Sequence, residues 1–261
     1  MRPLSRWRRA LAACGLLLVL AGCAPEEPTP RPTPSALRPS PTILVPTRPP
    51  PRTIELGRSV RNRPIEAQVF DGSAGCILIV GGLHGDESLS PALVERLSQH
   101  LDRDPEARAN RCIVLVPRAN PDGLAAGTRA NARGVDLNRN FPASNYRPGR
   151  DHGAKALSEP ETRALYGALT RYHPSCVVAI HGPLNGVDPD GGAASRQLAR
   201  DMANVGPLPY RDLPAHPGSL GSYAGYRLGV KMITYELDSR RGASRSLDRH
   251  LSPLLSAIRN G

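Results

Sequence analysis

Four short apolar runs constrain the fold of this chain more than any other feature of its sequence. They are rich in valine and isoleucine and cover residues 76–80, 112–117, 176–180 and 231–235. Continuous runs of this length are typical of strands that are buried on both faces of a parallel sheet. Helical patterns lie between and after them, at residues 91–101, 158–172, 193–204 and 247–258. We therefore predict one α/β domain with a mostly parallel, mixed sheet and helices on both of its faces.

The first 22 residues have the composition of an export signal. Arginines at positions 2, 6, 8 and 9 precede an apolar stretch of twelve residues, from Ala10 to Ala21. A helix of that length is about 18 Å long, too short to cross the apolar core of a bilayer. We therefore predict a secretory signal peptide over residues 1–22. Its last residues and the next, Leu20-Ala21-Gly22-Cys23, resemble the bacterial lipoprotein box, which predicts that Cys23 is lipidated.

A proline-rich segment separates this signal from the rest of the chain. Eleven prolines lie between Ala24 and Thr53, with few residues that could form a core. Segments of this composition stay extended, so residues 23–53 predict a tether between a lipid anchor and a folded domain at 54–261. We expect an exported protein of the bacterial cell envelope, anchored to a membrane. Because Ala24 rather than aspartate follows Cys23, we expect the periplasmic face of the outer membrane if the bacterium has two membranes.

Charge and aromatic content argue against nucleic acid as a partner. The formal net charge of the chain is +11, but residues 54–261 hold 26 basic and 21 acidic side chains. The chain has two phenylalanines and one tryptophan, and the tryptophan lies in the signal. Such a mildly basic domain lacks the strongly basic surface of nucleic-acid-binding proteins and suits an anionic substrate.

Three cysteines remain in the domain, and each lies at the start of an apolar run. They are Cys76, Cys112 and Cys176. Outside the cytosol, an odd number allows either one disulfide with one free thiol or three buried thiols. We favour three buried thiols. No two of these cysteines are close in sequence, which argues against a metal site made of them.

Several polar side chains follow the apolar runs at their carboxyl ends. In chain order they are His84 and Glu87, then Asn120, then His181, then Glu236. The carboxyl ends of parallel strands meet at one edge of a sheet, so we expect these side chains to converge. Two imidazoles and a carboxylate with a fourth position open are typical of catalytic zinc. We therefore predict one Zn²⁺ per chain, bound by His84, Glu87 and His181, and metal-assisted hydrolysis of an amide or ester.

Other charged residues near these motifs can be given roles. Glu236, at the end of an apolar run, is the natural general base, because burial raises the pKa of a carboxylate. Of the two cations Arg129 and Arg139, one can stabilise an oxyanion and the other can bind a substrate carboxylate. We assign Asp86 to the solvent or to the surroundings of the ligands, and we keep His216 as a candidate pocket residue.

Longer stretches of the sequence carry a resemblance to a known family. They are Gly57-Arg-Ser-Val60, His84-Gly-Asp-Glu87, Asn120-Pro-Asp-Gly123, the run from Gly127 to Pro142, Ser158-Glu-Pro-Glu-Thr162, and Gly218 to Gly225. Over these stretches the domain resembles the zinc carboxypeptidases of the carboxypeptidase A type, and most closely their short bacterial branch, the murein peptide amidases. The run 127–142 is long and specific.

This resemblance implies the same metal site and adds a neighbour to it. Residues His84, Glu87 and His181 match the zinc ligands of the family, and Glu236 matches its general base. By the same resemblance, Asp136 orients the imidazole of His84 through a hydrogen bond.

The resemblance also implies residues that contact the substrate. Arg129 would polarise the scissile carbonyl, and Asn138 and Arg139 would bind the terminal carboxylate of the substrate. The larger family members place a mobile tyrosine over the substrate. Tyr223 is the nearest candidate for it here, with Tyr226 behind it.

The activity implied is hydrolysis of peptidoglycan peptides at the amide bond between γ-D-glutamate and meso-diaminopimelate. Three alternatives remain at this point. The chain could be a general zinc carboxypeptidase, an N-acyl amino-acid deacylase of the aspartoacylase type, or a wall-binding lipoprotein without catalysis. The segment from Asp136 to Pro142 argues against the deacylase, and the complete set of ligands and base argues against a non-catalytic role.

Overall fold

The computed structural model describes residues 49–238 and 246–261. The predicted signal peptide, the predicted lipidation site Cys23 and most of the predicted tether lie outside the described residues. Within the described ranges, no helix has the length and apolar character needed to cross a membrane.

Seven strands in the described part of the chain form one mixed sheet. They are β1 (Arg52–Arg58), β2 (Pro64–Phe70), β3 (Cys76–Val80), β4 (Cys112–Val116), β5 (Cys176–His181), β6 (Gly186–Pro189) and β7 (Lys231–Glu236). Their order across the sheet is β1-β2-β4-β3-β5-β7-β6. The central strands β4, β3, β5 and β7 are parallel, while β2 and β6 pair antiparallel at either side of them. The predicted α/β fold with a mostly parallel, mixed sheet is confirmed.

The four apolar runs are the four central strands. Each of these strands is buried along nearly its whole length, because helices cover both faces. The outer strands β1, β2 and β6 were not predicted from the sequence. The residues of β2 alternate between exposed and buried positions over its first half, as expected where one face of a strand meets the solvent.

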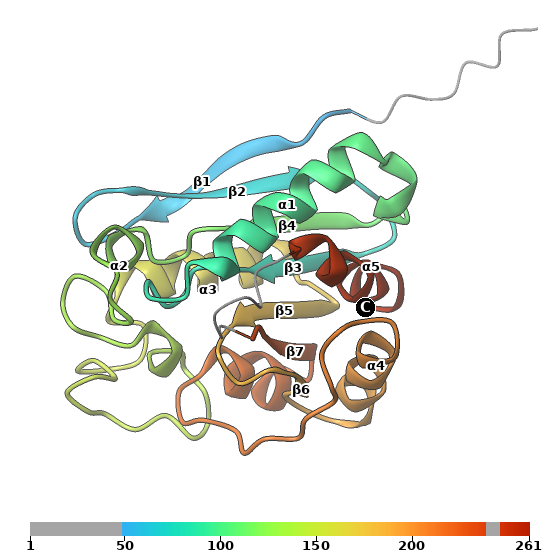
Figure 1. Ribbon diagram of the computed structural model, residues 1–261. Coiled ribbons are helices and arrows are strands. Elements are labelled where there is room, and N and C mark those ends of the chain that lie inside the picture. Colours follow the sequence, from blue (N-terminus) through green and yellow to red (C-terminus); the bar gives the residue numbers. More distant parts are fainter. Residues whose placement is uncertain (1–48, 239–245) are drawn as a thin grey trace, which may run out of the picture. The chain divides into compact units, whose positions relative to one another are not determined.

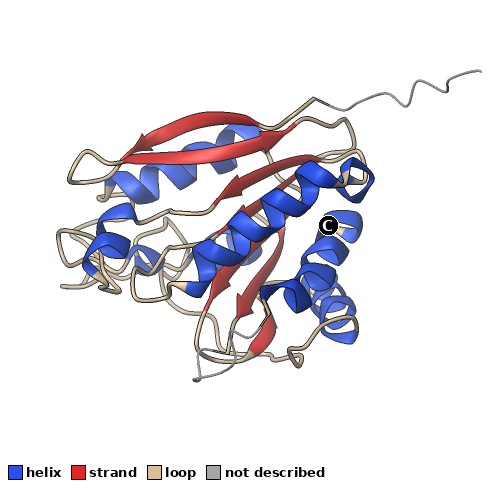
Figure 2. Ribbon diagram, turned by 45° about the horizontal axis from the view of Figure 1, so that its top comes forward, coloured by secondary structure: helices blue, strands red, loops and turns tan. Residues whose placement is uncertain are grey.

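Helices lie on both faces of the sheet (Figures 1 and 2). The longer ones are α1 (Leu89–Arg103), α3 (Pro160–Tyr172), α4 (Ala193–Asn204) and α5 (Leu251–Asn260). The shorter ones are η1 (Pro105–Arg108), α2 (Pro121–Ala126), η2 (Leu137–Arg139), the π-helix η3 (Ser222–Arg227) and η5 (Leu247–His250). The predicted helix at 193–204 has the bounds of α4, whereas the pattern at 247–258 is divided between η5 and α5.

Two hydrophobic clusters hold these layers together. The first packs α1, α4 and α5 against one face of the sheet, with Leu97 and Ile258 among its fully buried members. The second packs α3, η3 and the segment after η2 against the other face, with Leu165 and Phe141 among its members. Both faces of the sheet are therefore covered by apolar contacts, and polar side chains lie at the carboxyl ends of the central strands.

The expectation of three buried thiols is wrong. Cys76 and Cys112 form a disulfide, and only Cys176 among the domain cysteines is a free, buried thiol. The reason is the register of the sheet: Cys76 and Cys112 are the first residues of β3 and β4, and they lie directly opposite each other in this parallel pair. The disulfide joins the two strands at their amino ends, at the far end of the strands from the polar residues discussed next.

Candidate metal centre and active site

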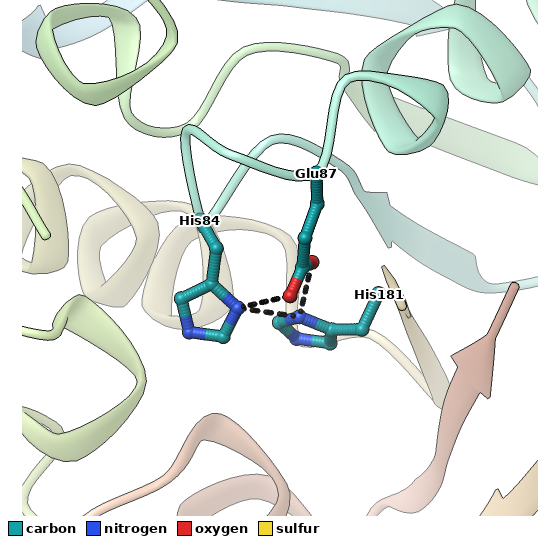
Figure 3. Close-up of side chains that lie close together, drawn as sticks. All are labelled: His84, Glu87 and His181. Carbon is teal, nitrogen blue, oxygen red and sulfur yellow. Dashed lines mark hydrogen bonds and ion pairs between the residues drawn. The ribbon is translucent and has the colours of Figure 1, made fainter. Parts of the chain in front are cut away.

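Three predicted ligands converge at the carboxyl ends of the central strands. His84 and Glu87 lie on the loop between β3 and α1, and His181 is the last residue of β5 (Figure 3). Their ligand atoms all lie within 4.8 Å of one another. His84 Nδ1 is 2.7 Å from one carboxylate oxygen of Glu87, and His181 Nδ1 is 3.0 Å from the other. The two Nδ1 atoms are 3.1 Å apart, so all three side chains face one point.

The loop that carries His84 is fixed by close contacts on both sides. Ser90 Oγ accepts a hydrogen bond from the backbone N–H of Gly82 and donates one to the carbonyl of Ile180, next to His181. On the other side, a Cβ at Gly85 would collide with the backbone of Gly123 in α2, so only glycine fits there. The loop is thereby held against β5, and the two histidines keep their separation.

Asn120 lies beneath this loop and does not face the metal ligands. Its side-chain oxygen accepts a hydrogen bond from the backbone N–H of Gly123 and caps the amino end of α2. The side chain is fully buried. Asn120 thus positions the segment that supports the His84 loop.

Asp136 orients His84 as a ligand. An oxygen of its carboxylate is 3.0 Å from Nε2 of His84. With the proton on Nε2 donated to Asp136, the lone pair of Nδ1 points toward Glu87 and His181. Burial disfavours the imidazolium of His84, but hydrogen bonds to Asp136 and Glu87 outweigh burial and raise its pKa. Burial likewise opposes the charge of Glu87, but its hydrogen bonds to the two histidines lower its pKa to about 2.

This donor set fits a zinc ion. Two imidazole nitrogens and a carboxylate that stays ionised are the three protein ligands of many catalytic zinc sites. The convergence of three lone-pair donors on one point, in a buried place, is also an arrangement that a cation would stabilise. The predicted ligand residues are therefore brought together in a geometry that suits the predicted metal.

Glu236 ends β7 beside His181. The two residues are paired in the parallel register of β5 and β7, and the backbone N–H of Leu237 donates to the carbonyl of His181 over 2.7 Å. Glu236 is 8% exposed. Burial raises its pKa, helped by the nearby charge of Glu87. A buried carboxylate with a raised pKa next to the ligand set is suited to accept a proton from water.

Two arginines and an asparagine complete the site. Arg129 donates from Nε to Asp136 over 3.0 Å, and its Nη1 is 3.6 Å from Glu87. Arg139 donates to the carbonyl of Asn138 over 2.7 Å. The amide oxygen of Asn138 accepts a hydrogen bond from the backbone N–H of Leu220 over 2.9 Å, which leaves its NH₂ group to face a ligand.

These side chains line one cavity of about 160 Å³. Its walls hold the three metal ligands together with Glu236, Arg129, Asn138, Arg139 and His216. A wider cavity of about 370 Å³ shares Glu87, Arg129 and His181 with it. Asp86 is exposed, as expected for a residue assigned to the solvent or to the surroundings of the ligands. The arrangement places a buried carboxylate, two cations and the three candidate metal ligands around one small space.

Comparison with known proteins identifies the family. The zinc carboxypeptidase family matches residues 48–185, which include His84, Glu87 and His181. The chain belongs to the zinc carboxypeptidase family. It is therefore a hydrolase, and the family as a whole is zinc-dependent.

Relatives and solved structures agree with this assignment. Murein peptide amidase A of Escherichia coli strain K12 is 36% identical over 209 residues, which cover 72% of this chain and 81% of the relative. The relative of the same name from Vibrio campbellii is 34% identical over 225 residues, which cover 78% of this chain and 86% of the relative. The crystal structure of murein-tripeptide amidase MpaA from Escherichia coli O157 is similar with a TM-score of 0.62, 33% identity, and coverage of 80% of this chain and 92% of that chain.

A more distant structure shares the fold. Bovine thrombin-activatable fibrinolysis inhibitor matches with a TM-score of 0.67 at 19% identity, over 80% of this chain and 88% of that chain. At that identity the likeness shows the zinc carboxypeptidase fold alone.

The predicted contact of Tyr223 with substrate is not supported. Tyr223 is 7% exposed and lies in the second hydrophobic cluster. Its ring stacks on Phe141, with ring centroids 6.3 Å apart, and packs against Tyr166. Tyr226 is 56% exposed on η3 and does not line the cavity beside the metal ligands. Tyr223 thus packs in the core of this zinc carboxypeptidase, and Tyr226 lies on its surface.

Two aspartates beside the site were missed from the sequence. Asp188 and Asp190 are 6% and 7% exposed and line a small cavity that begins at Glu236. Burial raises the pKa of both, in Asp190 to about 6. Their closeness to the site depends on the antiparallel pairing of β6 with β7. The available signal was two carboxylates, in Asp188-Pro-Asp190, a few residues after His181.

Proposed function

We propose that the chain is a lipid-anchored zinc hydrolase that cleaves the amide bond between γ-D-glutamate and meso-diaminopimelate in peptidoglycan peptides. The observation that carries this proposal is the single cavity shared by His84, Glu87, His181, Glu236 and the two arginines. The amidases of Escherichia coli and Vibrio campbellii support the substrate class, because their sequence similarity covers most of this chain and most of each relative.

Each residue of the cavity has its own role in the proposed reaction. Zinc held by the three ligands would polarise the scissile carbonyl and make water acidic enough to attack it near neutral pH. Glu236 accepts the proton of the attacking water and then delivers it to the leaving amine, so that it ends the cycle as a carboxylate. Arg129 donates hydrogen bonds to the carbonyl oxygen as negative charge develops on it.

The carboxylate of the leaving residue has its own partners. Arg139 can present two parallel N–H groups to a carboxylate, and Asn138 can donate from its NH₂ group. Both side chains line the cavity that holds the candidate metal ligands, and neither lines the wider cavity. Binding there would place the amide bond of the leaving residue next to the metal ligands and Glu236.

We also propose where the protein lies in the cell. Lipidation of Cys23 would hold the chain on a membrane of the bacterial envelope, on the periplasmic face of the outer membrane if there are two membranes. The proline-rich tether would let the domain reach the wall, since thirty extended residues span roughly 90 Å.

The test is product analysis by mass spectrometry of the purified full chain supplied with zinc. The substrates are the tripeptide L-alanyl-γ-D-glutamyl-meso-diaminopimelate and an ordinary peptide with a free C-terminus. We expect free diaminopimelate from the wild type, and a loss of at least about 10³-fold in kcat for Glu236→Gln, which cannot accept the proton. The matched control is Glu106→Gln, an exposed residue of η1 that lies away from the cavity, which should keep full activity.

A general carboxypeptidase activity is the second candidate. The catalytic chain of human carboxypeptidase N is 30% identical over 171 residues, which cover 50% of this chain and 37% of the relative. Release of the last residue from the ordinary peptide, without diaminopimelate from the tripeptide, would favour this candidate. Release of neither product by zinc-loaded wild type would refute both.

A further inference from the structure

His216 lies between the cavity of the metal ligands and a second, smaller cavity. The smaller cavity has a volume of about 40 Å³ and begins where the first one ends. Both cavities are lined by Asn138, Leu184, His216 and Glu236. A group bound at Arg139 would therefore have His216 beside it and the smaller cavity beyond.

The backbone at His216 is held in place while its ring is left available. The carbonyl of His216 accepts hydrogen bonds from Ser222 Oγ over 2.6 Å and from the backbone N–H of Ser219 over 3.2 Å. Two residues further on, the carbonyl of Gly218 accepts a hydrogen bond from the backbone N–H of Phe141 over 2.9 Å. Within the part of the chain that the structure describes, no residue hydrogen-bonds to the imidazole ring. His216 is exposed and lines both cavities, so its ring is open to solvent and to a group bound in either cavity.

The charges around His216 differ on its two sides. Arg139 and Arg129 line the cavity of the metal ligands and not the smaller one, and Arg129 donates a hydrogen bond to Asp136. Partial burial and these two arginines lower the pKa of His216, so its ring is neutral at neutral pH and offers one donor and one acceptor nitrogen. On the other side, the smaller cavity contains Asp188 and Asp190. That cavity is therefore a negative environment with room for one small polar group.

We infer that His216 hydrogen-bonds an ammonium group on the side chain of the leaving residue, and that it thereby selects leaving residues that carry a second amine. This inference rests on the proposed function, because it assigns the carboxylate of the leaving residue to Arg139. With that carboxylate fixed, the side chain of the leaving residue extends past His216 toward the smaller cavity. The ammonium group can donate to the acceptor nitrogen of the ring while the two aspartates stabilise its charge. The carboxylate on the same distal carbon then stays outside the negative cavity, on the solvent side of the exposed His216.

The test compares two substrates that differ only in that amine. One is the tripeptide ending in meso-diaminopimelate, and the other ends in 2-aminopimelate, which lacks the distal amine. The variants are His216→Phe, which keeps a planar ring without polar atoms, and His216→Gln, which keeps a donor and an acceptor. We expect His216→Phe to reduce kcat/KM about tenfold to a hundredfold for the diaminopimelate substrate, mainly through KM. We expect it to leave the aminopimelate substrate unchanged and His216→Gln to recover part of the loss.

The control is His173→Asn, at the exposed end of α3. His173 has a left-handed backbone conformation that asparagine adopts readily, so this change should affect neither substrate. Equal losses with both substrates in His216→Phe would assign His216 a merely structural role and overturn the inference, while the proposed function would stand. Equal cleavage of both substrates by the wild type would also overturn it. Cleavage of neither substrate by the wild type would overturn the proposed function, and the inference with it.

Discussion

The carboxylate of Asp136 accepts hydrogen bonds from three groups that the proposed reaction needs. They are Nε2 of His84, Nε of Arg129 and the backbone N–H of Asn138. Burial opposes the charge of Asp136, but the hydrogen bond and charge of His84 and the charges of Arg129 and Arg139 outweigh burial and hold the pKa of Asp136 far below its usual range. A metal ligand, the cation for the carbonyl oxygen and the residue for the substrate carboxylate are thus positioned by one side chain.

Asp190 differs from Asp136, because its pKa is raised in the folded chain and that of Asp136 is lowered. Burial raises its pKa from 3.8 to about 6, helped by Asp188 and Glu236 and opposed by the hydrogen bond from Thr234. Between those two pH values the folded chain binds more protons than the unfolded chain, so stability falls as the pH rises. The contribution of the protonated form is complete below about pH 4 and is lost above about pH 6.

Asp190→Asn should therefore stabilise the metal-free protein at neutral pH and not at acidic pH. Asparagine can still accept the hydrogen bond from Thr234 and carries no charge. We expect the free energy of unfolding to rise by about 1–3 kcal/mol at pH 7.5, with no gain at pH 4, in urea titrations with a chelator present. The control is Asp86→Asn, whose exposed side chain meets solvent in both states. A gain of equal size at both pH values would show that packing, and not charge, is responsible.

The elements of the fold differ in how far the sequence determines them. The central strands β3, β4, β5 and β7 follow from continuous apolar runs, because both of their faces are buried. The outer strand β6 spans four residues, begins with glycine and ends with proline, and depends on its pairing with β7 and on a bridge from Val187 to Tyr210. Strand β1 begins at Arg52 and has no fully buried residue; its two aliphatic side chains, Ile54 and Leu56, are half-buried against the second cluster, and two alternating apolar positions are too short a pattern to predict a strand.

The residues of the candidate site also differ in how far the sequence predicts their positions. Residues that follow a predictable strand, such as His84, His181 and Glu236, can be brought to one edge by topology alone. The environments of Tyr223 and Asp190 depend on which elements pack against η3 and β6, and the sequence motifs do not contain that information. The disulfide had a usable signal, since Cys76 and Cys112 occupy the first positions of two strands, but their pairing requires that β3 and β4 be neighbours.

This disulfide should stabilise the fold without affecting the chemistry. It closes a loop with a sequence separation of 36 residues, and it lies at the amino ends of β3 and β4, away from the ligands. We expect the double variant Cys76→Ser, Cys112→Ser to lose about 2–4 kcal/mol in the free energy of unfolding and to keep its kcat at 25 °C. Urea titration and initial rates would measure both effects, and reduction of the wild type should reproduce them. A drop in kcat for the folded double variant would show that the disulfide affects catalysis as well as stability.

At the scale of the whole molecule, the metal should act as a link between two parts of the sheet. Its ligands come from the loop after β3 and from the end of β5, so bound zinc stabilises only the folded chain. Zinc at about a thousand times its Kd should add about 4 kcal/mol to stability and raise the Tm measured by calorimetry after treatment with a chelator. The variant Glu87→Ala should show little of this increase. An identical Tm for the wild type with and without zinc would rule out a metal site made of these three residues.

The separation of the ligands along the chain determines when the protein can bind its metal. His84 and His181 are 97 residues apart in sequence, and they meet only when β3 and β5 are paired. The unfolded chain therefore has no complete site to fill. Under the proposed export, the chain crosses a membrane before it folds and takes its metal from the compartment that it enters. The ions present there, more than the intrinsic preference of the ligands, then decide which metal it carries.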